Sequence, residues 1–259
     1  MTMFDATIIA IVEGMTEYLP VSSTGHIILT SHALGLPDND FMNYFTVMVQ
    51  FGPILAVVVE YFRYFTQKLF LYPVLFVAFL PAAMIGLAAH KAIDAALGSL
   101  WVVALAWLIG GIFLVFMERI FHPDRVHHRT VDGVNFRQAL TIGFFQCLAL
   151  IPGMSRSAAT IWGGLTVKMD QRTATEFSFL LAVPTLVAAT LYKGYKGFGS
   201  FSSSDWTLLL WGNVVSFLVG WVTIRAFIKY VSRHSFKAFG IYRIALGLGT
   251  MVYLFVRGQ

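Results

Sequence analysis

The sequence predicts an all-α, polytopic integral membrane protein with six transmembrane helices and two re-entrant helical hairpins. The composition supports this class, because 58% of the 259 residues are hydrophobic and only 12% are charged. A soluble domain carries about 25% charged residues. In addition, the charged residues fall between apolar segments of about 20 residues, the length that an α-helix needs to cross a bilayer. Two shorter apolar runs are interrupted by proline and serine, and these interruptions predict the hairpins.

Six apolar segments are long enough to span the membrane, namely 41–62, 71–90, 100–117, 176–195, 206–230 and 239–256. The basic residues are scattered between these segments and form no cluster, so we expect no nucleic-acid partner. A single cysteine, Cys147, excludes an internal disulfide. The whole chain is therefore predicted to be one membrane domain.

The first broken segment is unusually polar for its position near the N-terminus. The apolar run 6–12 leads into two carboxylates, Glu13 and Glu17, which lie four residues apart and so project from one face of a short helix. Pro20 then ends that helix. Ionisable residues at membrane depth are costly and usually functional, so this segment predicts a reaction or transport site.

A second short helix is expected over 26–34, directly after this break. Ser22, Ser23 and Thr24 are candidates for its N-cap. The first-turn N–H groups of such a helix lack intrahelical partners and favour an anion. His26 would lie close to these hydroxyls, and an imidazole can transfer a proton near neutral pH.

The second half of the chain repeats the pattern of a broken apolar segment. An apolar run over 136–150 is interrupted after Pro152, and a second run follows over 158–167. Ser155, Arg156 and Ser157 lie at this break, ahead of a predicted helix N-terminus. A planar guanidinium with hydroxyls and backbone N–H groups is a suitable donor set for an oxyanion.

The two halves, about 1–120 and 136–259, therefore form a weak internal repeat joined by a linker. Aligning Pro20 with Pro152 gives an offset of 132 residues, and Pro53 lies opposite Pro184 at an offset of 131. Each half carries three spans, and an odd number of crossings inverts the second copy. We therefore expect the hairpins to enter the membrane from opposite faces and to meet near its midplane.

The distribution of lysine and arginine predicts the orientation. Cytoplasmic loops are enriched in these residues. One side of the predicted topology carries thirteen of them: Arg63, Lys68, Arg119, Arg125, Arg129, Arg137, Lys168, Arg172, Arg225, Lys229, Arg233, Lys237 and Arg243. The other side carries four: Lys91, Lys193, Lys196 and Arg257. This bias makes the first side, with the linker, cytoplasmic and places both termini outside.

A divalent metal is a natural partner for the two carboxylates. Glu13 and Glu17 cannot face a phosphate directly unless a cation or a proton lies between them, and a metal ion that keeps several waters would serve. Simpler interpretations fit the same residues. The carboxylates could be an exposed pair on the membrane surface, His26 could be a structural histidine, and Arg156 could be only the charge partner of Glu17.

Four motifs carry a resemblance to a known family. They are Glu13-x-x-x-Glu17, the run from Ser22 to His26, Pro152-Gly153-x-Ser155-Arg156-Ser157-x-x-Thr160, and the segment 176–184. Together they resemble the undecaprenyl-pyrophosphate phosphatase family of the bacitracin-resistance type. The resemblance implies a bacterial inner-membrane enzyme that removes the terminal phosphate of undecaprenyl pyrophosphate and so recycles the lipid carrier for cell-wall synthesis. It also implies an outward-opening site and a divalent metal, Mg²⁺ or Ca²⁺.

The resemblance assigns roles to the motif residues. The expected catalytic residues are Glu13, Glu17, Ser23, His26 and Arg156. The expected substrate-binding residues are Ser22, Thr24, Ser155, Ser157 and Thr160. The two carboxylates would hold the metal or orient His26, and Arg156 would clamp the pyrophosphate. The nucleophile stays open between Ser23 activated by His26 and a water activated by His26 or the metal.

An alternative function fits the same architecture. Inverted repeats with re-entrant tips are typical of secondary transporters, so a transporter or a flippase of the lipid carrier is the competing hypothesis. The acid and base groups at the two tips exceed what anion translocation requires, which favours the phosphatase. Membrane lipid is the expected surrounding in either case. The sequence leaves the oligomeric state open between a monomer and a homodimer.

Overall fold

The computed structural model describes residues 1–37, 39–97, 99–120, 130–197 and 202–258, so most of the predicted linker lies outside the described residues. Within the described residues all regular structure is helical. Six segments are long and apolar enough to cross a membrane: Asp40–Glu60, Leu71–Ala88, Leu100–Met117, Gln171–Tyr195, Ser203–Val231 and Lys237–Arg257. The predicted all-α, polytopic fold is thereby confirmed.

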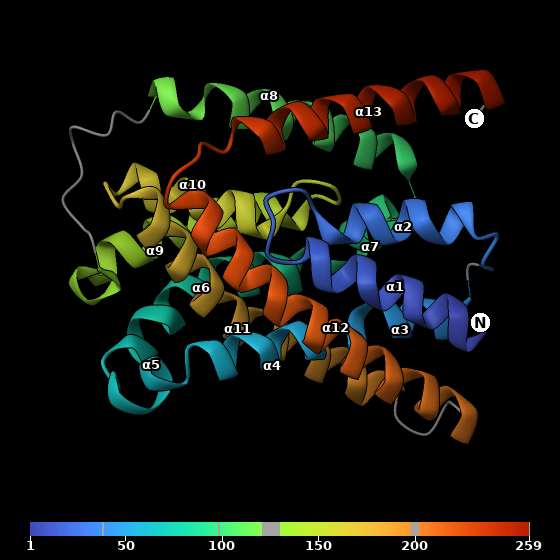
Figure 1. Ribbon diagram of the computed structural model, residues 1–259, viewed down its shortest axis with the longest axis horizontal. Helices are drawn as coiled ribbons and strands as arrows, with labels where there is room; N and C mark the ends of the chain where they lie inside the picture. The colour runs from blue at the N-terminus through green and yellow to red at the C-terminus, as the bar shows by residue number, and fades with distance from the viewer. Residues whose placement is uncertain (38, 98, 121–129, 198–201, 259) are drawn as a thin grey trace.

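The helices follow one another in the order that the apolar segments predict (Figure 1). The first half contains α1 (Met3–Thr16), α2 (Ser23–Ala33), α3 (Asp40–Met48), α4 (Phe51–Glu60), α5 (Phe62–Gln67), α6 (Leu71–Ala88), α7 (His90–Leu97) and α8 (Leu100–Ile120). The second half contains the short 3₁₀ turn η2 (Val131–Gly133), α9 (Phe136–Gln146), η3 (Cys147–Leu150), α10 (Arg156–Thr166), α11 (Gln171–Gly197), α12 (Ser203–Val231) and α13 (Lys237–Arg257). The first span is thus built from two consecutive helices, α3 and α4.

Helix starts recur between the halves at an offset of 133 residues. Thr2 caps α1 and Asn135 caps α9, and both caps are reciprocal capping boxes. Ser22 caps α2 and Ser155 caps α10, with φ angles of 72° and 71°. The offset between the caps is one residue larger than the offset of 132 between Pro20 and Pro152. The packing recurs too, because α1 lies against α12 while α9 lies against α6.

Helices α8 and α13 form a long pair along the upper edge of the molecule in Figure 1. Glycines allow their backbones to approach closely, as in other membrane helix pairs. A Cβ atom on Gly240 would lie 2.7 Å from the carbonyl oxygen of Gly111, and one on Gly111 would lie 2.8 Å from that of Gly240. This close contact places α13 near the hairpin tips.

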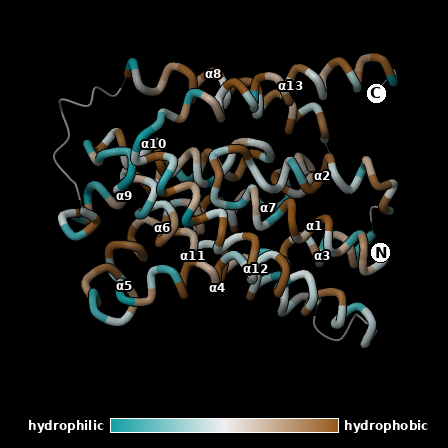
Figure 2. Tube along the Cα trace, viewed as in Figure 1, coloured by the Kyte–Doolittle hydropathy of each residue, from teal (hydrophilic) through white to brown (hydrophobic). Residues whose placement is uncertain are grey.

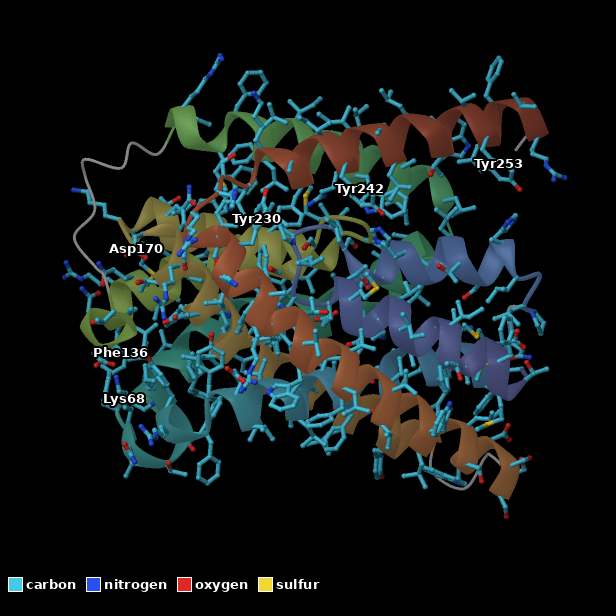
Figure 3. All side chains as sticks on the ribbon, viewed as in Figure 1. Lys68, Phe136, Asp170, Tyr230, Tyr242 and Tyr253 are labelled. Atoms are coloured by element: carbon cyan, nitrogen blue, oxygen red, sulfur yellow. The ribbon has the colours of Figure 1, made fainter. Side chains whose placement is uncertain are left out.

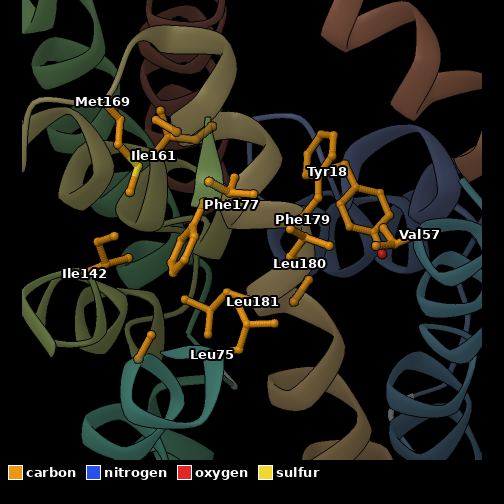
Figure 4. Packing of buried hydrophobic residues seen from close by; sticks show 14 of the residues in the cluster. Tyr18, Val57, Leu75, Ile142, Ile161, Met169, Phe177, Phe179, Leu180 and Leu181 are labelled. Atoms are coloured by element: carbon orange, nitrogen blue, oxygen red, sulfur yellow. The ribbon is translucent and has the colours of Figure 1, made fainter. Parts of the chain in front are cut away.

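The core is centred on α11, which contributes several fully buried side chains (Figure 4). Phe179 of α11 packs edge-on against Tyr18, with ring centroids 4.9 Å apart. The Tyr18 hydroxyl donates to the carbonyl oxygen of Pro53 at 2.7 Å. Tyr18, which lies just after the end of α1, is therefore fixed to both α4 and α11.

The outer faces of the spans carry large apolar side chains that no part of the described chain covers. Leu191, Leu210 and Phe255 are 68%, 69% and 80% exposed. Figure 2 shows hydrophobic positions along the length of the helices. A soluble protein rarely exposes so much apolar surface, whereas a bilayer covers such faces.

Candidate functional site

The two hairpins end in turns of the same unusual geometry. Ser22 and Ser155 lie in the left-handed region, which residues other than glycine rarely adopt. The Oγ atom of Ser22 accepts a hydrogen bond from the backbone N–H of Gly25 at 3.4 Å, and that of Ser155 accepts one from Ala158 at 3.2 Å. Strained backbone of this kind clusters at functional sites. Both predicted substrate-binding serines thus act as N-caps in this structure.

Arg156, the first residue of α10, joins the second tip to the first. Its Nη2 donates to Oε1 of Glu17 at 2.7 Å, and both side chains are less than a tenth exposed. Its Nη1 donates to the carbonyl oxygen of Ser178 at 3.1 Å. The guanidinium also lies over the ring of Tyr18, 5.5 Å from its centroid. The structure therefore brings a cation and a carboxylate together between the tips.

Ser23, the first residue of α2, belongs to the same cluster. Its hydroxyl donates to Oε2 of Glu17, so that Glu17 uses one oxygen for Arg156 and the other for Ser23. The predicted partner of Ser23 was His26. In this structure the group that can accept the Ser23 proton is the Glu17 carboxylate.

Glu13 lies one helical turn before Glu17 and is fully buried. Among the described residues neither of its carboxylate oxygens has a hydrogen-bond partner. Burial, and then the charge of Glu17, raise the pKa of Glu13 well above its usual range. A buried carboxylate of this kind needs a proton or a cation. The surface-pair interpretation of these two residues is therefore wrong.

The Glu13 oxygens also test whether the site fits a divalent metal. Their free lone pairs suit a hard cation, which prefers carboxylate oxygen. The described residues contain no group of three or more histidine, cysteine, aspartate or glutamate side chains that could hold a metal. A metal at this position would thus be held by Glu13 and Glu17 and would complete its shell with water or substrate oxygens.

His26 has partners other than those predicted. Its Nδ1 lies 2.7 Å from the carbonyl oxygen of Ser22, and its Nε2 lies 2.7 Å from the hydroxyl of Tyr242. The ring stacks on Tyr242 and meets Trp107 edge-on. His26 lies outside the candidate spans, and burial lowers the pKa of its imidazole. The hypothesis that a carboxylate orients His26 finds no such hydrogen bond among the described residues.

The remaining predicted binding residues contact protein atoms. The Ser157 hydroxyl donates to the carbonyl oxygen of Tyr18 at 2.8 Å. The Thr160 hydroxyl lies 2.6 Å from that of Ser178, which fixes α10 to α11. Thr24 is half-buried in the first turn of α2. Ser178 was missed as a site residue, although it lies within the quoted motif 176–184.

Two further residues at the site, both on α13, were missed by sequence reasoning. Tyr242, labelled in Figure 3, contacts His26. Arg243 was counted with the cytoplasmic cations, and this is wrong: its side chain is fully buried and donates to backbone carbonyls of both hairpin tips. Neither residue stands out in the sequence, because a tyrosine or an arginine near the end of an apolar segment is typical of a membrane interface.

The fold and the site define a polytopic α-helical membrane protein with a buried, charged centre between two helix N-termini. Residues 6–249 match the family model of the bacitracin resistance protein BacA, and the chain belongs to this family.

Named relatives cover nearly the whole chain. The undecaprenyl-diphosphatase of Bdellovibrio bacteriovorus is 44% identical over 255 residues, which are 98% of this chain and 97% of the relative. That of Flavobacterium johnsoniae is also 44% identical, over 96% of this chain and 94% of the relative. That of Aquifex aeolicus is 41% identical, over 96% of this chain and 97% of the relative.

Proposed function

We propose that this protein is an undecaprenyl-diphosphatase, which hydrolyses undecaprenyl pyrophosphate to undecaprenyl phosphate and inorganic phosphate. The observation that carries the proposal is the contact of Arg156 and Ser23 with the same buried carboxylate, Glu17, between two helix N-termini. The family and the names of its members supply the substrate. The reaction recycles the lipid carrier for cell-wall synthesis, and this recycling counters bacitracin.

The two helix N-termini supply the donors for the pyrophosphate. Ser23 and Arg156 are the first residues of α2 and α10, whose leading N–H groups have no intrahelical acceptor. The Arg156 guanidinium adds a charged fork that suits phosphate oxygens. These fixed donors stabilise the charge that develops on the transferred phosphoryl group.

The hydrogen bond between Ser23 and Glu17 supports Ser23 as the nucleophile. Its Oγ would attack the terminal phosphorus while its proton passes to Glu17, and the bond from phosphorus to the bridging oxygen would break. Undecaprenyl phosphate leaves. Water then attacks the phosphoserine, the bond from phosphorus to Oγ breaks, inorganic phosphate leaves, and Glu17 returns the proton to Ser23. His26, whose lowered pKa favours the neutral imidazole, would take up the proton of that water through the Tyr242 hydroxyl, which is bonded to its Nε2. Direct attack by a water on the substrate is the alternative.

A divalent metal, Mg²⁺ or Ca²⁺, is part of the proposal. Glu13 would be its main ligand, because its oxygens are free, and Glu17 would share in holding it. When bound, such an ion would neutralise charge on the pyrophosphate. The protein itself keeps the carboxylates buried and four residues apart, so that they can face a single cation.

We place the protein in the bacterial inner membrane, with both termini and the opening of the active site outside. Figure 1 supports this topology, because the N- and C-termini lie at the same end of the molecule. Figure 3 shows Lys68, Asp170 and Tyr230 at the opposite end, where the basic loops are expected. The hairpins would be re-entrant, and the two halves would be inverted repeats. A homodimer is compatible with this arrangement, and no nucleic-acid partner is proposed.

A transporter or flippase of the lipid carrier is the second candidate. The recurrence of helix bounds between the halves favours it, since repeats of this kind are typical of transporters. Fold alone does not separate the two functions. The Ser23 and Glu17 pair favours chemistry, because translocation of an anion needs no group that accepts a proton from a hydroxyl.

Phosphate release by detergent-purified protein tests the proposal. A long-chain prenyl pyrophosphate is the substrate, with and without a chelator, for the wild type, Glu17→Ala, Arg156→Ala and Ser23→Ala. The matched control is Arg172→Ala, which removes an exposed arginine that pairs with Glu176.

We expect metal-dependent release in the wild type and the control and none in the three site variants. A phosphoserine trapped by acid quench would identify Ser23 as the nucleophile. Release without phosphoserine would favour the water. Absence of release from folded wild type in any divalent ion would refute the phosphatase and favour transport.

A further inference from the structure

We infer that Arg243 of α13 is a positioning residue, which holds the two hairpin tips in the relative arrangement that the site requires. Its Nη1 donates to the carbonyl oxygens of Pro20, at 3.2 Å, and of Met154, at 3.1 Å. Its Nη2 donates to those of Gly153, at 3.0 Å, and of Ala106, at 2.9 Å. One guanidinium thus connects the first tip, the second tip and α8. For its role in catalysis the inference rests on the proposed phosphatase function.

The chemistry of these contacts explains why an arginine lies here. The hairpin turns are irregular backbone, and their carbonyls have no helical partner. Buried carbonyl groups need donors, and a guanidinium offers several in one plane. Arg243 is fully buried and has no carboxylate within ion-pair distance among the described residues. Its guanidinium therefore bonds only backbone carbonyls, those of the two tips and of Ala106 on α8, among the described residues.

The bonded carbonyls lie next to the residues that form the site. Met154 immediately precedes the cap Ser155, and Pro20 lies two residues before the cap Ser22. The caps in turn present Arg156 and Ser23 as the first residues of their helices. Because a single nitrogen, Nη1, bonds both tips, the position of Arg243 limits how far the two helix N-termini can separate.

Gly110 of α8 provides the space for this side chain. A Cβ atom at Gly110 would lie 2.2 Å from Nη2 of Arg243, well inside van der Waals contact. The end of a free arginine could move aside, but this guanidinium is held by four carbonyls. Gly110→Ala should therefore displace it while leaving residue 243 unchanged. Gly249 lies on α13, the helix that carries Arg243. It has open space around it, so Gly249→Ala offers a control.

The test compares Arg243→Lys, Gly110→Ala and the control Gly249→Ala with the wild type, as full-length protein in detergent. Lysine keeps the charge but cannot bond four carbonyls in one plane. We measure kcat and KM for a long-chain prenyl pyrophosphate, the unfolding temperature, and hydrogen exchange of the amides at 21–23 and 153–156.

We expect Arg243→Lys to lower kcat by at least tenfold with KM within threefold of the wild type, and to speed exchange at both tips. Gly110→Ala should act in the same direction and more weakly, while Gly249→Ala should change neither. Exchange in the α12 segment 206–212 should stay as in the wild type in each variant.

Wild-type kcat and tip exchange in Arg243→Lys would overturn the inference, as would a loss of kcat with unchanged exchange at the tips. If Arg243→Lys does not fold, Gly110→Ala decides by the same two measurements. Inactive wild-type protein would refute the phosphatase function, whereas the exchange measurement would still report whether Arg243 holds the tips together.

Discussion

The buried pair of Arg156 and Glu17 makes a quantitative prediction about the effect of removing each charge. With Glu13 protonated, as its raised pKa favours when no metal is bound, the Arg156 and Glu17 side chains form a neutral pair. Arg156→Gln would leave the Glu17 carboxylate buried without a cation, a net charge of −1. Glu17→Gln would leave Arg156 beside Glu13, which can release its proton and become the counter-ion, because its oxygens have no hydrogen-bond partner among the described residues. Arg156→Gln should therefore be the more damaging change.

The magnitudes follow from the burial of the pair, whose side chains are 9% and 6% exposed. Removing one partner of a buried ion pair costs about 3–5 kcal/mol, which we expect for Arg156→Gln. Losing hydrogen bonds to a charged group costs about 1.5–3 kcal/mol, which we expect for Glu17→Gln. At about 2–4 °C per kcal/mol for a chain of this size, the unfolding temperature should fall by roughly 6–20 °C and 3–12 °C.

The assay is thermal unfolding in detergent with a chelator present, for both single variants and for the double variant. Because the double variant removes both charges, its loss should be smaller than the sum of the single losses by about 2 kcal/mol. The pair of Lys68 and Asp132, whose side chains are 31% and 44% exposed, should show an interaction below about 0.5 kcal/mol when treated in the same way. Equal losses in the two single variants, or additive losses within about 0.5 kcal/mol, would refute the reasoning.

Two further predictions concern the cap and the histidine. Ser22→Ala should lose about 1 kcal/mol of stability with the cap, whereas Ser22→Gly should unfold at or above the wild-type temperature, because glycine relieves the positive φ. Equal unfolding temperatures of Ser22→Ala and Ser22→Gly would contradict this account of Ser22. Tyr242→Phe should lower kcat up to about tenfold by removing the partner of His26. Tyr253 also lies on α13, and its ring contacts His32, so Tyr253→Phe is the control and should retain wild-type kcat. Equal kcat values for Tyr242→Phe and Tyr253→Phe would contradict a role for Tyr242.

Local patterns in the sequence determined the fold class and the position of the two hairpins. The length of an apolar segment fixes whether it can span a bilayer, and this property needs no knowledge of its neighbours. Pro20 and Pro152 lie in the breaks that follow α1 and η3, and a proline keeps a helix from continuing through such a break because it lacks an N–H and has a restricted φ. The serine that follows each break is a cap for the same kind of reason, because its side chain bonds a backbone N–H three residues away.

The contacts of the site were decided by tertiary structure alone. Glu17 and Arg156 lie 139 residues apart in the chain, His26 and Tyr242 lie 216 apart, and Pro20 and Arg243 lie 223 apart. No local pattern specifies which of several polar groups becomes the partner of another at such separations. The partners follow from the packing of α13 along α8 and of α10 against α11, which carries these side chains to the two helix N-termini.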